Sequence, residues 1–196
     1  MAERLTRRAV VERAARLSDD IGFDELTITK LGRSLGIAPP GVYRHVADLG
    51  DLRRALSRRA AHDVAAVLSA ACAGLSGADA LTALAHALRS WAARHPGQYA
   101  ALQVAPDPDD ADGQAAAAEV LATFASALRA YRLDGDDLTD ALRLIRSTLH
   151  GFVTLEHGAG FRQPRSLDAT FARIVATLHA ALAGWSSSVR EVPRPS

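Results

Sequence analysis

Apolar residues recur at intervals of three and four along most of this chain, and this spacing constrains the fold more than any other feature of the sequence. In the first such segment the apolar side chains share one helix face: Val10, Ala14, Leu17 and Ile21. Hydrophobic residues make up 48% of the chain and aromatic residues only 5%, so alanine and leucine, which favour helices, must fill the core. We therefore expect an all-α fold of about nine helices.

Glycine and proline divide the first part of the chain into three short helices. Gly22 and Gly36 are placed to end the first two as left-handed caps, and two prolines open the third, where a missing backbone N–H costs nothing. The expected helices are about Thr6 to Ile21, Thr27 to Leu35 and Pro39 to His45. Longer helices then follow, and they can bundle around a core of their own.

The predicted domains are a DNA-binding unit over residues 1–47 and a ligand-binding and dimerisation bundle over 48–186, with a flexible tail over 187–196. The clearest loop of the bundle is the acidic, proline-containing segment from Pro106 to Asp110, which we expect to be solvated and mobile.

Nothing in the sequence indicates a membrane or an oxidising compartment. Cys72 is the single cysteine, so an intramolecular disulfide and a cysteine metal cluster are both excluded. No apolar run reaches the ~18 residues of a membrane span, and the charged first residues are not followed by the apolar core of a signal peptide. We expect a cytoplasmic protein, and its 22 arginines against one lysine are typical of a GC-rich bacterial genome.

Charge is distributed unevenly although the formal net charge is only +1. The first 60 residues carry 12 basic against 8 acidic side chains, and the remainder carries 11 against 14. This asymmetry is consistent with a polyanionic partner for the first unit. Ordinary solvated charge explains it equally well.

The segment from Leu26 to Val46 has the layout of a helix-turn-helix. Two short helices meet at Gly36, and the second presents small residues that let its backbone approach base edges. Hydroxyl and basic side chains nearby can reach phosphates or bases. The candidate DNA-binding residues are Thr27, Thr29, Lys30, Pro39, Pro40, Gly41, Tyr43, Arg44 and His45.

These residues resemble the tetracycline-repressor (TetR) family of regulators. The resemblance covers about residues 6–56 and rests on Gly22-Phe23, Leu26-Thr27, Leu31, Leu35-Gly36-Ile37, Pro39, Val42-Tyr43-Arg44-His45 and Leu52. It implies a three-helix DNA-binding domain, a larger helical domain for ligand binding and dimerisation, and repression that a small molecule relieves. Members of the family as a rule lack enzymatic activity.

The chain departs from the family pattern at three positions. Ala38 stands where a Ser or Thr cap is usual, which costs ~1 kcal/mol. Val46 replaces a phenylalanine, and Leu49 replaces a lysine that touches a phosphate, so the salt dependence of DNA binding should weaken by roughly one unit. Arg53 or Arg54, one turn on, is expected to replace part of that contact.

A second resemblance concerns the C-terminal domain. The segment from Leu149 to Glu156, with Gly160-Phe161 after it, is similar to the TetR subgroup named for a Trp-His-Gly signature, although no Trp stands just before His150. Aromatic residues of the second domain either fill its core or line an apolar cavity with a few polar groups. The candidate ligand-binding residues are Trp91, Tyr99, Gln103, Phe124, Arg146 and His150.

Several residues allow two interpretations. Arg4, Arg7 and Arg8 either follow the DNA backbone or are solvated charges. The Tyr43 ring is either packed in the core or places its hydroxyl on a phosphate. His150 and His157 share a helix face, but seven residues is the wrong spacing for a metal pair on one helix, so neither a metal nor a cofactor is expected.

No nucleophile elbow, His-Glu-x-x-His pair, P-loop or dinucleotide fingerprint is present, which argues against an enzyme. The sequence predicts a homodimeric repressor released from a palindromic operator by a small-molecule effector. The expected dimer face is formed by the helices from about Asp137 to Glu156 and Ser166 to Gly184, unless their apolar stripes face their own core. The alternatives are a DNA-binding regulator without a small-molecule effector and a small helical enzyme with an unrecognised site.

Overall fold

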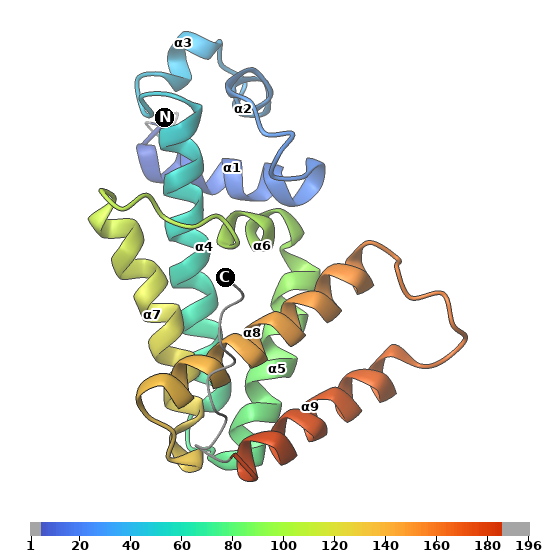
Figure 1. Ribbon diagram of the computed structural model, residues 1–196. Coiled ribbons are helices and arrows are strands. Elements are labelled where there is room, and N and C mark those ends of the chain that lie inside the picture. The colour runs from blue at the N-terminus through green and yellow to red at the C-terminus, as the bar shows by residue number, and fades with distance from the viewer. Residues whose placement is uncertain (1–4, 186–196) are drawn as a thin grey trace, which may run out of the picture.

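The computed structural model describes residues 5–185, which form nine α-helices, one short 3-10 helix and no strand (Figure 1). The predicted tail over 187–196 and Arg4 lie outside the described residues. The helices are α1 (Arg7–Ile21), α2 (Ile28–Leu35), α3 (Pro39–Val42), α4 (Leu49–Cys72), α5 (Gly77–Arg94), α6 (Pro96–Leu102), α7 (Ala111–Ala127), η1 (Arg129–Tyr131), α8 (Gly135–His157) and α9 (Leu167–Ala183). Among the described residues, no helix combines the length and the apolarity that a membrane crossing requires.

Side-chain caps begin the first two helices. The Thr6 and Thr27 hydroxyls each accept a hydrogen bond from the backbone N–H three residues on, at 3.2 and 3.1 Å. Gly36 ends α2 in the left-handed conformation (φ 69°, ψ 25°) as predicted. Gly22 also has a positive φ, of 93°, but its ψ of 147° is extended, so the cap expected there is not left-handed in ψ.

The small unit made of α1, α2 and α3 has a core of its own, which the start of α4 completes. Fully buried side chains from all four helices meet there: Val10, Ala14, Leu26, Leu31, Val42, Leu52 and Leu56. The α4 helix then continues for several turns into a second core, where Ala60, Val64 and Leu68 are buried. One helix of 24 residues therefore belongs to both units and connects them rigidly.

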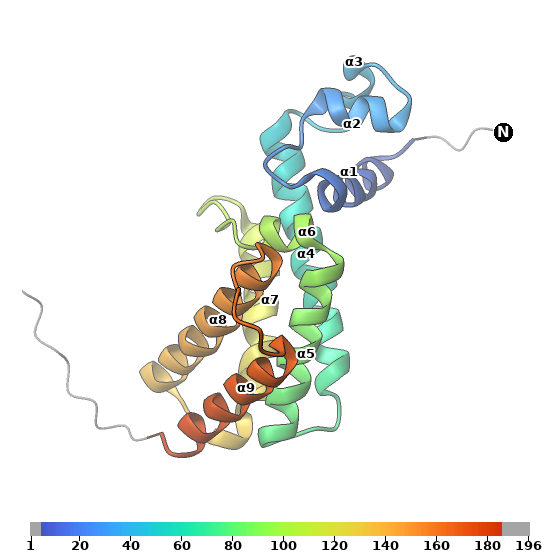
Figure 2. The ribbon, with the colours of Figure 1, turned by 90° about the vertical axis from the view of Figure 1, so that its right-hand side faces the viewer.

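The second core lies between α4, α5, α8 and α9 and is filled mainly by leucine, alanine and phenylalanine. Arg89 of α5 ties the α8–α9 hairpin to this body: its Nε donates to Glu156 at 2.8 Å and its Nη1 to Asp168 at 2.8 Å. The same guanidinium lies over the rings of Phe152 and Phe171. Figure 2 shows α8 and α9 side by side on one flank of the body.

The α6 helix holds the small unit against the body, and it lies directly beside α1 (Figure 1). Gly97 approaches the end of α1 so closely that a Cβ would overlap the Ser18 carbonyl group. The Asp19 carboxylate accepts hydrogen bonds from the Gln98 backbone N–H at 3.0 Å and from its amide nitrogen at 2.7 Å. It also contacts Nδ1 of His95 at 3.1 Å, so the end of α1 and the start of α6 form one clamped joint.

Candidate functional site

The turn between α2 and α3 depends on very close packing of the backbone. A Cβ at Gly32 would lie 2.9 Å from the Ile37 carbonyl oxygen, nearer than side-chain carbons normally approach. The left-handed Gly36 then reverses the chain, and its N–H bonds back to the carbonyls of Arg33 and Gly32. These two glycines fix the angle at which α3 leaves α2, which is the geometry a helix-turn-helix needs.

The third helix stands at the tip of the molecule, away from the body (Figure 1). It is shorter than predicted: the α-helix ends at Val42, and the next residues form turns in which the His45 and Val46 N–H groups both bond to the Val42 carbonyl, at 2.9 and 3.3 Å. Sharing one carbonyl between two donors tightens the chain and ends the α-helical pattern. No side chain caps the start of α3, because Ala38 has no hydroxyl.

All nine candidate DNA-binding residues lie on α2, on α3 or beside them, and none is buried. Tyr43 is 53% exposed, which excludes the alternative that its ring fills the core. Lys30 forms a 2.7 Å ion pair with Glu25, an exposed pair that a phosphate can replace at little cost. The surface made of Thr27, Thr29, Lys30, Pro39, Pro40, Gly41, Tyr43, Arg44 and His45 is called the tip surface below.

Arg7 supports the tip surface from behind. Its guanidinium donates to the His45 carbonyl oxygen at 2.7 Å and to both carboxylate oxygens of Asp51 at 2.7 and 2.8 Å. Asp51 also accepts from the Ala47 N–H at 2.9 Å, and its pKa falls to about 2, chiefly because of the bond to Arg7. The two sequence interpretations of Arg7, a DNA contact or a solvated charge, both missed this positioning role.

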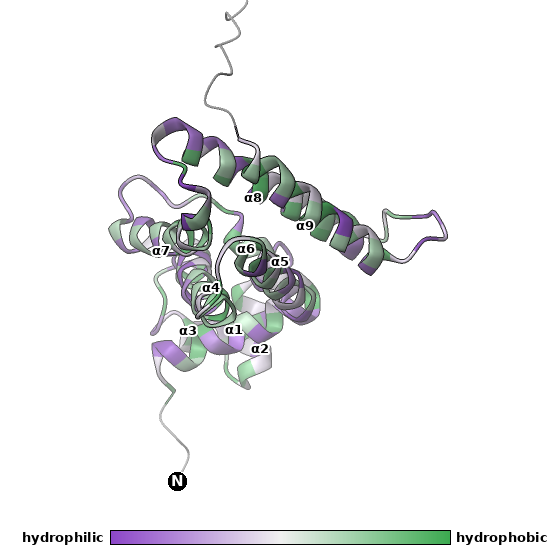
Figure 3. Ribbon diagram, turned by 90° about the horizontal axis from the view of Figure 1, so that it is seen from below, coloured by the Kyte–Doolittle hydropathy of each residue, from purple (hydrophilic) through white to green (hydrophobic). Residues whose placement is uncertain are grey.

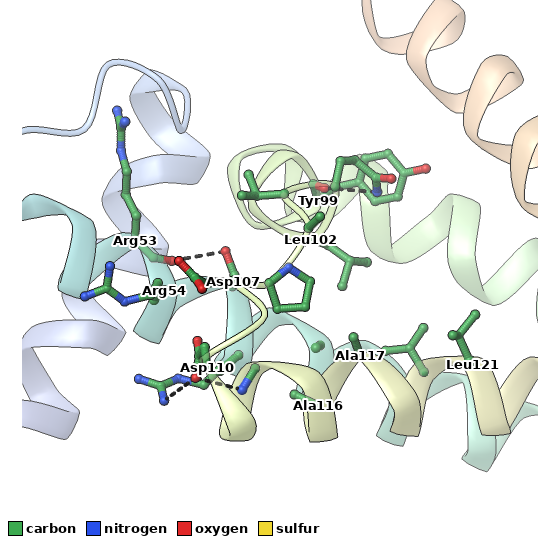
Figure 4. Close-up of a pocket in the computed structure, with 18 of the residues that line it drawn as sticks. Arg53, Arg54, Tyr99, Leu102, Asp107, Asp110, Ala116, Ala117 and Leu121 are labelled. Atoms are coloured by element: carbon green, nitrogen blue, oxygen red, sulfur yellow. Dashed lines mark hydrogen bonds and ion pairs between the residues drawn. The ribbon is translucent and has the colours of Figure 1, made fainter.

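A cavity of about 620 Å³ lies in the second unit between α4, α6, α7 and α8 (Figure 4). Five of the six candidate ligand-binding residues line it: Tyr99, Gln103, Phe124, Arg146 and His150. Trp91 does not; it is 3% exposed and packs in the core, with its ring 5.4 Å from that of His95. Its place on α5 faces away from the cavity, so the assignment of Trp91 as a lining residue was wrong.

The loop before α7 forms one wall of this cavity, contrary to the expectation of a solvated, mobile segment. Pro106, Asp107 and Asp110 all line it. The Asp110 carboxylate caps α7 through the Gly113 N–H at 3.0 Å and pairs with Arg58 at 3.4 Å. Its side chain is only 14% exposed. Charge runs in a sequence usually indicate solvent, and the pairing with α4 could not be read from local composition.

A hydrogen-bonded pair of side chains joins α6 to α8 at the far end of the cavity. The Tyr99 hydroxyl lies 3.0 Å from Nδ1 of His150, whose Nε2 lies 3.5 Å from the Thr154 hydroxyl. Burial raises the pKa of Tyr99 to about 12, although the nearby charge of Arg146 opposes the shift. The phenol therefore stays protonated at any physiological pH.

The α8–α9 hairpin forms one edge of the described chain when it is seen from below (Figure 3). Its apolar stripes face inward: Ile145, Leu149, Phe171 and Val175 are buried in the chain's own core. Amphipathicity was therefore not evidence for a dimer face. The outward side differs, because Leu155 is 50% exposed there and a Cβ at Gly151 would meet no atom within 4 Å.

Comparison with known proteins places this geometry in a family. A family model described as the C-terminal domain of tetracyclin repressor-like proteins matches residues 81–178. The chain is 38% identical over 180 residues to Rv0681 of Mycobacterium tuberculosis, described as an uncharacterized HTH-type transcriptional regulator, and the match covers 91% of this chain and 82% of that one. The chain belongs to the TetR family.

Two further relatives of this TetR-family chain bear on its fold. YobS of Bacillus subtilis, described as an uncharacterized HTH-type transcriptional regulator, is 26% identical over 151 residues, which are 77% of this chain and 78% of YobS. The crystal structure of BioQ with its double-stranded DNA operator shares the fold at a TM-score of 0.62, with 23% identity, covering 90% of this chain and 99% of BioQ. The predicted family and all-helical fold are confirmed, and the TetR-family chain is a DNA-binding transcriptional regulator, not an enzyme.

Several lining residues of the TetR-family cavity escaped the sequence analysis. Arg53, Arg54 and Arg58 come from α4, and Leu102, Val120 and Leu142 supply apolar surface. Arg53 is committed to the fold, because its Nη2 donates to the Asp24 carbonyl oxygen at 3.1 Å and its guanidinium lies over the Phe23 ring. It therefore does not stand in for the phosphate-binding lysine that Leu49 replaces. The Trp-His-Gly subgroup remains a prediction.

Proposed function

We propose that this TetR-family regulator is a cytoplasmic, homodimeric repressor that binds a palindromic operator and releases it when a small molecule fills the cavity. One observation carries the proposal: the seven-residue α6 touches both sites. Its end supplies Tyr99 and Leu102 to the cavity, while Gly97 and Gln98 at its start are clamped to the end of α1. A shift of α6 cannot leave α1 unchanged.

The DNA-binding half of the proposal rests on the tip surface. The residues at the start of α3 are small, so its backbone can approach base edges in the major groove. Tyr43, Arg44 and His45 then lie within reach of bases or phosphates. On the supporting helix, Thr27 and Thr29 present hydroxyls near a helix N-terminus, which suits a phosphate.

The homodimer rests on the outward side of the α8–α9 hairpin. Gly151 leaves open space that a second helix can enter, and Leu155 beside it exposes apolar surface that a partner would cover. A two-fold pair formed this way would present two copies of α3 to successive turns of DNA, roughly 34 Å apart.

Effector control follows from the joint between α6 and α1. A ligand that fits the cavity only when α6 has moved would favour a conformation in which the two tip surfaces no longer match the operator. Driving the protein from 99% DNA-competent to 1% requires about 5.5 kcal/mol of preference for the second conformation. That preference would have to come from contacts that differ between the two conformations at the cavity wall.

The decisive experiment measures DNA binding by fluorescence anisotropy on duplexes selected in vitro from a random pool, at two salt concentrations. The double variant Tyr43→Ala/His45→Ala should weaken binding about 30-fold or more, since each base or phosphate contact contributes ~1–3 kcal/mol. Its helical signal and its dimer mass should be unchanged. Arg162→Ala, an exposed change in the α8–α9 loop, is the matched control and should bind like the wild type.

Equal affinity of the double variant and the wild type for the selected duplex would refute the assignment of the tip surface. A wild-type affinity that does not fall with salt would refute contact with the DNA backbone.

A further inference from the structure

The cavity has two ends of different charge. At the end near the small unit, arginines 53, 54 and 58 face aspartates 24, 107 and 110. Figure 4 shows Arg53, Arg54, Asp107 and Asp110 together on one side, with Ala117 and Leu121 on the other. Arg58 is already paired with Asp110, and Arg53 is bonded to the Asp24 carbonyl. This end is therefore electrically balanced.

The α8 end is positive and has no acidic side chain among its lining residues. Arg146 makes no hydrogen bond or ion pair with another residue of the described chain, yet it lines the cavity close enough to Tyr99 to lower the pKa of that phenol. A partnerless guanidinium beside a buried hydroxyl is a site that favours an anion.

The Tyr99–His150 pair can supply a neutral donor to the same anion. When Thr154 donates to Nε2 of His150, the Nδ1–H of the ring donates to the Tyr99 oxygen. The phenolic O–H of Tyr99 is then free to donate to a ligand. One charged fork and one hydroxyl suit a single carboxylate.

The middle of the cavity is aliphatic. Side chains from four helices form it, namely Leu88, Leu102, Val120, Leu142 and Phe124. On α7 the neighbouring Ala116 and Ala117 have short side chains, which leaves room beside them. The lining extends from Gly50 near the start of α4 to His150 on α8, so the space suits an extended apolar group.

We infer that the effector is an amphipathic carboxylate, whose aliphatic chain lies along α7 and whose carboxylate binds Arg146 and the Tyr99 hydroxyl. This inference rests on the proposed function, in which this cavity is the effector site. The positive α8 end selects the carboxylate, and the aliphatic middle selects the chain. A cationic amphiphile would place its charge against Arg146 and bind poorly.

The test uses isothermal titration of the full-length protein with decanoate, decanol and decylammonium, each below its micelle concentration. Decanoate should bind at least about 10-fold more tightly than either other probe, because only it forms charge-assisted hydrogen bonds. Arg146→Gln should weaken decanoate about 10- to 100-fold and leave decanol unchanged. Arg146→Glu should reverse the order of decanoate and decylammonium.

Two further variants separate a specific site from general charge. Arg143→Gln removes an exposed arginine one turn earlier on α8, outside the cavity, and should leave decanoate binding unchanged. Tyr99→Phe keeps the buried ring and should weaken decanoate about 5-fold, the loss expected of one neutral donor. Equal binding of decanoate and decanol, no binding of decanoate, or an equal loss with Arg143→Gln and Arg146→Gln would each overturn the inference.

Titration of the DNA complex distinguishes this inference from the proposed function. Salt-dependent DNA binding without any decanoate binding would overturn the ligand class and leave the repressor intact. Decanoate binding that depends on Arg146 but does not release the DNA would support the ligand class and overturn effector control.

Discussion

The tip surface and the cavity were both sought in the sequence, and they differ in how far apart their determinants lie. The helix-turn-helix is built by neighbours: Gly32, Gly36 and Ile37 meet within a few residues. The cavity is built by distant partners, such as Tyr99 with His150 and Arg58 with Asp110, which are 51 and 52 residues apart. Local chemistry is visible in a sequence, whereas long-range pairing depends on how the helices pack.

The joint between the two regions offers the largest expected effect. Gly97→Ala would place a methyl group against the Ser18 carbonyl, so α6 and α1 must separate. We expect a loss of about 3 kcal/mol in the free energy of unfolding, measured by urea denaturation, together with weaker coupling of ligand and DNA binding.

Ala100→Val is the control for that change, since it adds bulk at an exposed position of the same helix. It should alter stability by less than about 1 kcal/mol, mostly through helix propensity. If the two variants lose the same stability, the close approach of Gly97 is not what holds the regions together.

The fold was predictable because the helix boundaries carry their own signals. Thr6, Thr27, Asp48 and Ser166 all cap helices where the sequence indicated a start. The packing partners of Trp91 and of the loop around Asp110 carried no such signal. An aromatic ring is equally suited to a core and to a cavity wall, and only the direction in which its helix faces decides between them.

A second, smaller effect concerns the support of the tip surface. Asp51 has a pKa of about 2 in the folded protein, against about 3.9 in an unfolded chain, so its pairing with Arg7 stabilises the fold fully above about pH 4. That stabilisation is lost as the pH falls from about 4 through 2. Asp51→Asn should cost about 1–2 kcal/mol at pH 7, because Arg7 is partly exposed and its charge is screened.

Urea titrations at pH 7 and at about pH 3 measure this effect, with Asp63→Asn as the control. Asp63 belongs to an exposed pair with Arg59 on the same helix and should contribute less than about 1 kcal/mol. The stability of Asp51→Asn should fall less between the two pH values than that of the wild type. An identical acid dependence of the two proteins would contradict the role assigned to Asp51.

The smallest expected effect lies at the start of α3, where the sequence departs from its family. Ala38 leaves the first turn of α3 without a side-chain cap, and the Gly41 N–H bonds only to the Ala38 carbonyl, at 2.8 Å. Ala38→Ser supplies a hydroxyl that can accept from the first turn, and it should stabilise the small unit by about 0.5–1 kcal/mol. Hydrogen exchange at Gly41 and Val42 should slow accordingly. Ala38→Val adds bulk without a hydroxyl and should give no such protection. If the serine variant gains no stability, α3 is held by the packing of Val42 alone, and the cap expected from the family pattern has no energetic role in this chain.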